Sequence, residues 1–167
     1  MRTVQLVGQK AAGRVARIDD GDYELVTRYR WRVIESREAD RPVKGPYAMA
    51  TFYEARRRVD ILMHTLITGW PMVDHANGNG LDNQRSNLRP TTTAQNNHNQ
   101  RPRFGTSSRY KGVTWHKRAR KWQASIKVDD RSHYLGLFAS EEEAAAAYAA
   151  AALKIQGEYA YVARGAA

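Results

Sequence analysis

The segment 73–97 places an acid and an imidazole side by side, Asp74 and His75, with asparagines following at Asn87 and Asn96. A carboxylate and an amide oxygen are hard ligands suited to Mg²⁺ or Mn²⁺. A neutral imidazole, with a reference pKa of about 6.5, can accept a proton at neutral pH. Hydrolysis of a phosphodiester needs both, because charge develops on the phosphate while a water molecule is deprotonated. These residue types suit a metal-assisted nuclease.

A β-hairpin followed by a helix is predicted to position these side chains. Residues 73–75 have the pattern of a strand end, the turn residues 77–80 follow, and residues 87–89 form the expected return strand. Threonines 91–93 indicate a helix entry, because their hydroxyls can cap free backbone donors. This unit can bring Asp74, His75 and Asn96 together. The alternative is an ordinary Asn-Gly hairpin with a salt-bridged Asp74 and a hydrogen-bonded His75, and His64 is expected to be a packing residue.

With the motif VDHANGNGLDNQRSNLRPTTTAQNN, residues 63–99 resemble the HNH endonucleases of the homing type found in phages and mobile introns. The resemblance implies a ββα-metal module in which Asp74 and Asn96 hold one divalent ion, Mg²⁺ or Mn²⁺. It implies that His75 activates the attacking water and that Asn87 is a structural brace. His98 is an alternative ligand that would shift the metal preference toward softer ions. A single metal site is expected to nick double-stranded DNA.

The net charge of +10 is concentrated in one part of the 167-residue chain. Residues 101–139 contain ten Lys or Arg and two Asp or Glu, whereas residues 61–100 contain two of each class. Such a concentration is expected where a polyanion docks. The chain has no cysteine, which excludes disulfides and thiolate zinc sites. Without a signal peptide or a membrane-crossing run, we expect a cytoplasmic protein, in the host cell cytoplasm if it is phage-encoded.

The basic stretch predicts three short antiparallel strands and one helix. Apolar and polar residues alternate over 113–116 and 122–128, and a third strand is expected at 134–138. Ser140 and Glu143 then form a predicted capping box ahead of a helix over 144–155.

The motifs YKGV, KW, YLG and AAAAYAAAALK make residues 108–162 resemble the plant APETALA/ethylene-response-factor type of DNA-binding domain. The resemblance implies a sheet that lies in the major groove of double-stranded DNA and a helix that backs it. By motif, the DNA-facing side chains are Lys111, Thr114, His116, Ser125, Lys127 and Tyr134. Several of these positions are Arg in the plant family, so fewer bidentate guanine contacts are expected here. Phosphate contacts are expected from Lys117, Arg118, Arg120 and Lys121, and also from three residues that precede the first strand: Arg101, Arg103 and Arg109.

The predicted fold class is α+β, with a β-rich region at 1–62 that completes the nuclease core, the HNH module at 63–99, a linker at 100–108 and the DNA-binding domain at 109–163. The predicted function is a metal-dependent HNH endonuclease, directed to double-stranded DNA by its C-terminal domain. The alternative is a non-catalytic, sequence-specific DNA-binding regulator. We expect a monomer, with a dimer possible, that uses no small-molecule cofactor and binds no membrane.

Overall fold

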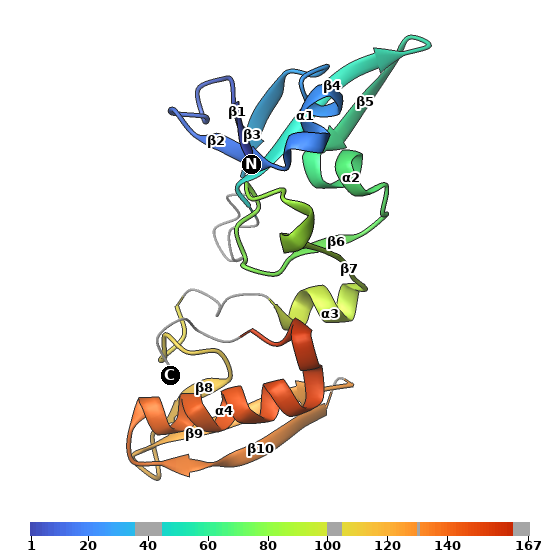
Figure 1. The fold of residues 1–167 in the computed structure, drawn as a ribbon. Helices are drawn as coiled ribbons and strands as arrows, with labels where there is room; N and C mark the ends of the chain where they lie inside the picture. The colour runs from blue at the N-terminus through green and yellow to red at the C-terminus, as the bar shows by residue number, and fades with distance from the viewer. Residues whose placement is uncertain (36–44, 100–104, 130, 162–167) are drawn as a thin grey trace. The chain divides into compact units, whose positions relative to one another are not determined.

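The computed structural model describes residues 1–35, 45–99, 105–129 and 131–161, which form two units (Figure 1). The first unit contains the described residues up to Asn96, and the second contains those from Asn97 onward. Each unit has its own hydrophobic core. None of the helices in the described ranges is long and apolar enough to span a lipid bilayer.

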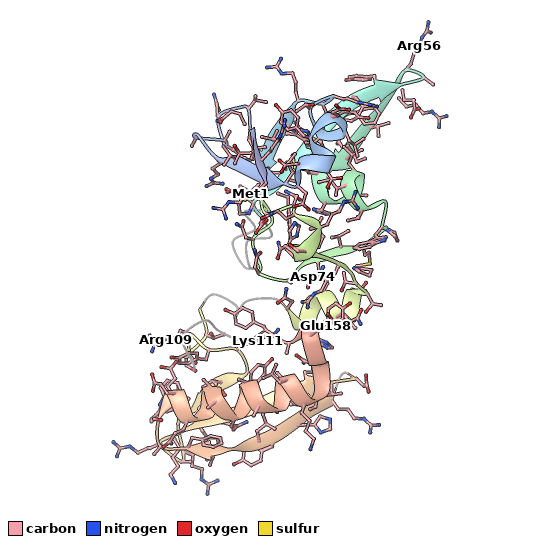
Figure 2. The ribbon with its side chains drawn as sticks, viewed as in Figure 1. Met1, Arg56, Asp74, Arg109, Lys111 and Glu158 are labelled. Atoms are coloured by element: carbon pink, nitrogen blue, oxygen red, sulfur yellow. The ribbon has the colours of Figure 1, made fainter. Side chains whose placement is uncertain are left out.

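Three small antiparallel sheets and several short helices make up the first unit. Strand β1 pairs with β2, β4 lies between β3 and β5, and β6 pairs with β7. The elements are β1 (Arg2–Gln5), β2 (Val15–Ile18), η1 (Asp20–Asp22), α1 (Tyr23–Val26), β3 (Trp31–Ile34), β4 (Tyr47–Glu54), β5 (Arg57–Leu62), α2 (Met63–Thr68), β6 (Val73–His75), η2 (Arg85–Asn87) and β7 (Leu88–Pro90). Helix α3 (Thr93–His98) spans the division, and its last two residues belong to the second unit. Figure 2 shows Arg56 at the tip of the β4–β5 hairpin, directed away from the sheet.

The core of the first unit forms around Trp31, whose side chain is fully buried. Its indole Nε1 donates a hydrogen bond to the carbonyl of Val26 at 2.8 Å, so the buried ring has no unsatisfied donor. Met63 and Ile67 pack one face of α2 against the same cluster. Helix α2 ends at Gly69, which adopts the left-handed φ of 70° that terminates many helices.

The second unit is a three-stranded antiparallel sheet with one helix against it, as the sequence predicts. The strand order is β10, β9, β8. The elements are β8 (Val113–His116), β9 (Lys121–Val128), β10 (Arg131–Phe138), α4 (Glu141–Gln156) and η3 (Gly157–Tyr159). The predicted capping box is confirmed, since Ser140 and Glu143 each accept a hydrogen bond from the other's backbone N–H. Buried alanines let α4 approach the sheet closely.

Candidate nucleic-acid interface and the Asp74 hairpin

The sheet of the second unit has one face against α4 and one face toward solvent. Val113, Ala124 and Ile126 are fully buried, and they pack against residues of α4. Side chains alternate along a strand, and directly paired residues share a face. The strand register therefore places a mostly polar set on the opposite face, which we call the outer face: Thr114, His116, Lys121, Gln123, Ser125, Lys127, Ser132, Tyr134 and the apolar Leu137.

Most of the predicted DNA contacts of the sheet lie on the outer face. They are Thr114, His116, Lys121, Ser125, Lys127 and Tyr134, while Arg118 is exposed in the turn between β8 and β9. Their contact with DNA stays a prediction. Gln123 was missed, although the alternation of Lys121, Gln123 and Ser125 along one strand identifies it as a member of the same face.

His116 has a fixed role in the turn that follows its strand. Its Nδ1 accepts a hydrogen bond from the backbone N–H of Ala119 at 3.0 Å. An accepting Nδ1 leaves the proton of the neutral ring on Nε2. His116 therefore offers an N–H donor at its other nitrogen.

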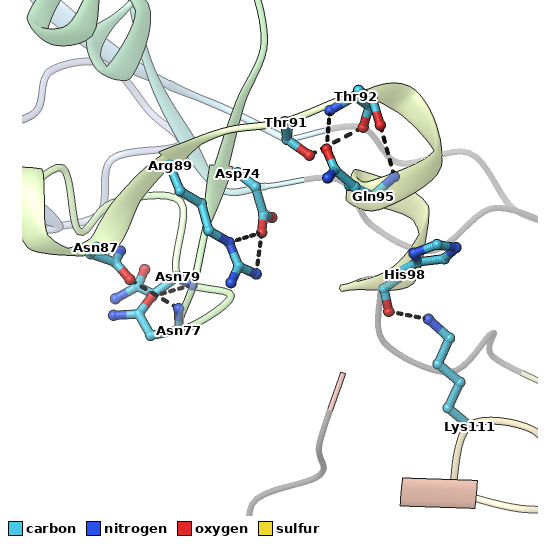
Figure 3. A network of polar contacts seen from close by, with 10 residues as sticks. All are labelled: Asp74, Asn77, Asn79, Asn87, Arg89, Thr91, Thr92, Gln95, His98 and Lys111. Carbon is cyan, nitrogen blue, oxygen red and sulfur yellow. Dashed lines mark hydrogen bonds and ion pairs between the residues drawn. The ribbon is translucent and has the colours of Figure 1, made fainter. Parts of the chain in front are cut away.

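Lys111 does not lie on the outer face with the other predicted contacts, and its role in DNA binding stays a prediction. Its Nζ donates a hydrogen bond to the carbonyl of His98 at 2.5 Å (Figure 3) and another to the carbonyl of Asn97 at 3.0 Å. Burial lowers the pKa of this ammonium to about 8. The Lys111 side chain therefore caps carbonyl groups at the carboxyl end of α3, where a cation is favourable.

The predicted contacts before the sheet are not placed on the outer face either. Arg109 forms an ion pair of 3.1 Å with Glu142, in the first turn of α4. Its guanidinium carbon also lies 4.9 Å from the ring centroid of Tyr110. Arg101 and Arg103 lie outside the described residues.

Asp74, the predicted metal ligand, is paired with an arginine in the β6–β7 hairpin. Its Oδ2 accepts hydrogen bonds from Nε of Arg89 at 2.8 Å and from Nη2 at 2.6 Å (Figure 3). A cation thus already neutralises this carboxylate, which does not fit a preformed site for a divalent ion. Within the described ranges, no group of three or more His, Asp or Glu side chains could hold a metal. The ion predicted at Asp74 and Asn96, or at His98, stays a prediction.

His75 is buried among other rings. Its centroid lies 5.0 Å from that of His64 and 5.7 Å from that of Tyr47. Its Nε2 lies 3.4 Å from Oδ1 of Asn83, a fully buried amide. Burial lowers the pKa of His75, while Asn83, Asp74 and Asp82 oppose that shift. The pKa of His64 falls to about 3, through burial and through the neighbouring His75.

Asn87 braces the long connection between β6 and β7. Its side-chain oxygen accepts a hydrogen bond from the backbone N–H of Asn77 at 2.9 Å, and its Nδ2 donates to the carbonyl of Asp82 at 2.7 Å. Asn77 also donates to the carboxylate of Asp82 at 2.7 Å. These contacts fix the shape of the loop whether or not it has any chemistry.

Helix α3 holds the half-buried Asn96 and begins with a reciprocal cap. The Thr92 hydroxyl accepts a hydrogen bond from the backbone N–H of Gln95 at 3.3 Å. In return, the side-chain oxygen of Gln95 accepts one from the backbone N–H of Thr92 at 2.9 Å. The predicted threonine cap is therefore confirmed.

Arg89 was missed as the partner of Asp74, although the predicted hairpin offered a signal: two opposite charges on adjacent strands.

Comparison with known proteins finds relatives among plant transcription factors. Over 53 residues the chain is 49% identical to the AP2-like ethylene-responsive transcription factor AIL7 of Arabidopsis thaliana, a match that covers 30% of this chain and 11% of the relative. It is 47% identical over 53 residues to the AP2-like ethylene-responsive transcription factor CRL5 of Oryza sativa subsp. japonica, covering 30% of this chain and 8% of the relative. The match thus spans about a tenth of each relative. No family model matches the chain. No solved structure matches it.

This similarity confirms the predicted ethylene-response-factor-like part and corrects the predicted activity. The matched relatives are named as transcription factors. The prediction of an enzyme, an HNH endonuclease that hydrolyses phosphodiester bonds with magnesium, is therefore wrong. The catalytic roles given to Asp74, His75 and Asn96 are withdrawn with it. The buried Asp74 ion pair and the buried, neutral His75 agree with the plainer alternative of a structural hairpin.

Proposed function

We propose that the chain is a non-catalytic, sequence-specific regulator that binds double-stranded DNA through the outer face of its C-terminal sheet. One observation carries the proposal: the C-terminal unit, whose motifs resemble the plant domain, has a largely polar and basic sheet face on the side opposite α4. Helix α4 would then keep the sheet rigid without touching the nucleic acid.

The composition of the outer face suits both the backbone and the base edges of DNA. Lys121 and Lys127 are exposed and can neutralise phosphates, which gives affinity and register. Thr114, Ser125 and the Nε2 of His116 can hydrogen-bond to base edges in the major groove. Because the outer face has no arginine in its strands, the bidentate guanine contacts that dominate many interfaces are not available there. We expect moderate discrimination between sequences.

Salt-dependent binding by the full chain tests this surface. The double variant Lys121→Ala, Lys127→Ala should lower the slope of log affinity against log salt by about two, since each neutralised phosphate contributes about 0.9. Lys154→Ala is a single-charge control, because Lys154 is exposed on α4 away from the outer face, and it should leave the slope nearly unchanged. Equal losses in the double variant and the control would overturn the proposal.

Plasmid integrity tests the absence of catalysis. Supercoiled plasmid incubated with the chain should stay supercoiled in Mg²⁺ and in chelator alike. Nicks that need Mg²⁺ and disappear in His75→Ala would show endonuclease activity and overturn the proposal of a non-catalytic regulator.

A further inference from the structure

The β3–β4–β5 sheet of the first unit also presents a basic face to solvent. Residue pairs across β4 and β5 share faces, and Thr51 pairs with Asp60 while Tyr53 pairs with Arg58. Arg32 on β3 pairs with Met49 and so belongs to the same side. We call this set of five, Arg32, Thr51, Tyr53, Arg58 and Asp60, the arginine face. Its opposite side buries Trp31 and Ala50 in the core.

A single carboxylate organises the arginine face. Asp60 accepts hydrogen bonds from Nε and Nη2 of Arg58, the closest at 3.0 Å. It also accepts from the Thr51 hydroxyl at 2.5 Å. Nη2 of Arg32 donates to the oxygen of Thr51 at 3.0 Å and lies 3.7 Å from Asp60. Two guanidinium groups are therefore held at fixed positions on one sheet surface.

Both guanidinium groups keep donors that these contacts do not use. A guanidinium has five N–H donors, and the bonds above involve Nε and Nη2 of Arg58 but only Nη2 of Arg32. The side chains of Arg32 and Arg58 are 44% and 55% exposed, so their remaining donors can reach a ligand. Tyr53 adds an exposed ring beside them.

The charge of the surrounding hairpin favours an anionic partner. Arg56 continues the basic set at the tip of the hairpin, where the acidic side chain is Glu54. Two ordered arginines served by one carboxylate leave a net positive charge on the face. A two-stranded ribbon such as the β4–β5 hairpin fits the major groove of duplex DNA, and guanidinium forks held in place match the acceptors of guanine and phosphate.

We propose that the arginine face is a second DNA-contacting surface, with Arg32 and Arg58 as its contact residues and Asp60 as the residue that positions them. The choice of duplex DNA as partner rests on the proposed function. The surface itself belongs to the first unit, outside the part that resembles the plant domain. The chain then reads DNA with two separate sheets.

The competing explanation is that these ion pairs and hydrogen bonds form on a solvent-exposed face and have no role in binding. Exposed ion pairs contribute little to stability, so such a network could be lost without consequence for binding. The two explanations give opposite results for Asp60→Asn. This change makes the face more positive, so unspecific attraction alone would tighten DNA binding. If Asp60 positions the two arginines, the same change should weaken binding to the preferred sequence several-fold.

The test uses the full chain and a duplex selected from a random pool by the wild-type protein. Arg58→Ala should lower affinity for the selected duplex about tenfold, the size of one good contact. Arg57→Ala is the matched control, because Arg57 is an exposed neighbour on β5 whose side chain lies on the other side of the strand. It should change affinity less than Arg58→Ala.

The results separate this inference from the proposed function. An effect of Arg58→Ala with none from Lys121→Ala, Lys127→Ala would keep the arginine face and overturn the outer face, and the reverse would do the opposite. A loss confined to one base position indicates base contact, whereas a uniform loss on all duplexes indicates phosphate contact, and both support the inference. Equal affinities of Arg58→Ala and Arg57→Ala, tighter binding by Asp60→Asn, or tighter binding of the wild type to duplex RNA than to the selected DNA would overturn it.

Discussion

Asp74 and Arg89 face each other directly across the β6–β7 hairpin, and the carboxylate accepts two hydrogen bonds from one guanidinium group. Their side chains are 6% and 13% exposed, so the pair is largely shielded from water. A shielded pair of this kind adds little net stability, because desolvation offsets the attraction. Removing one partner is costly, since the remaining buried charge loses this compensation.

Asp74→Asn should therefore lower the free energy of unfolding by about 3–5 kcal/mol, measured by urea denaturation. Arg89→Met added to Asp74→Asn should recover much of that loss, because the stranded charge is then gone. Asp20→Asn is the control, as Asp20 pairs with the chain terminus on an open surface. A urea midpoint unchanged by Asp74→Asn would contradict the buried pair.

The local elements of both units could be predicted from the sequence because their instructions are short-range. Ser140 with Glu143 and Thr92 ahead of α3 each act within a few residues, and each is found where expected. Strand alternation likewise sorted most of the outer face, since it depends only on period two.

The contacts of individual charged side chains could not be predicted in the same way. Lys111 turns to two carbonyls before the sheet, and Arg109 to a glutamate that comes 33 positions later. Motif matching assigns a residue type to a position but does not show which nearby acceptor the side chain meets. Asp74 illustrates the same limit. The adjacent Asp74 and His75 were predicted to form a catalytic site, whereas Asp74 pairs with Arg89 on the opposite strand.

Acid should destabilise the first unit through its two buried imidazoles. The pKa of His64 is about 3 in the folded chain, and burial lowers that of His75 as well. The unfolded rings titrate near 6.5, so below that pH the unfolded state binds more protons and stability falls, by up to about 1.4 kcal/mol per pH unit for each ring. This stability is complete above about pH 6.5 and is lost progressively toward the folded pKa.

Urea midpoints measured between about pH 7 and pH 4.5 would show this slope. His64→Phe should make the slope shallower, because one group then no longer titrates. His133→Gln, a change at an exposed histidine of β10, should leave the slope unchanged. Identical slopes in wild type and His64→Phe would show that the buried ring is not responsible.

Gly112→Ala should unfold the second unit more readily, because Gly112 lies against the helix that backs the sheet. An added Cβ would come within 2.1 Å of the Tyr148 ring and 2.6 Å of the carbonyl of Ser125. Overpacking of this kind costs about 1–3 kcal/mol beyond the penalty for a positive φ. Thermal unfolding of the full chain measures the loss.

Gly105→Ala is a close control for that experiment. Gly105 has a φ of +83°, near the +73° of Gly112, but nothing lies within 4 Å of its added Cβ. The difference between the two variants therefore isolates the clash with Tyr148 from the backbone penalty. Equal destabilisation would mean that helix α4 shifts to accept the methyl group.

At the tip of the β4–β5 hairpin, replacing Arg56 by glycine should raise stability and weaken DNA binding. Ala55 and Arg56 occupy the left-handed region, with φ of 47° and 64°, between the paired Glu54 and Arg57. Turns of this type favour Asn-Gly, and a residue with a side chain costs about 1–2 kcal/mol there. Arg56→Gly should raise the urea midpoint, whereas Arg57→Gly, in the extended strand, should lower it. Because Arg56→Gly also removes a charge beside the arginine face, DNA binding should weaken at low salt while stability rises. A fall in the urea midpoint of Arg56→Gly would show that the arginine side chain contributes more to the folded hairpin than its backbone strain costs.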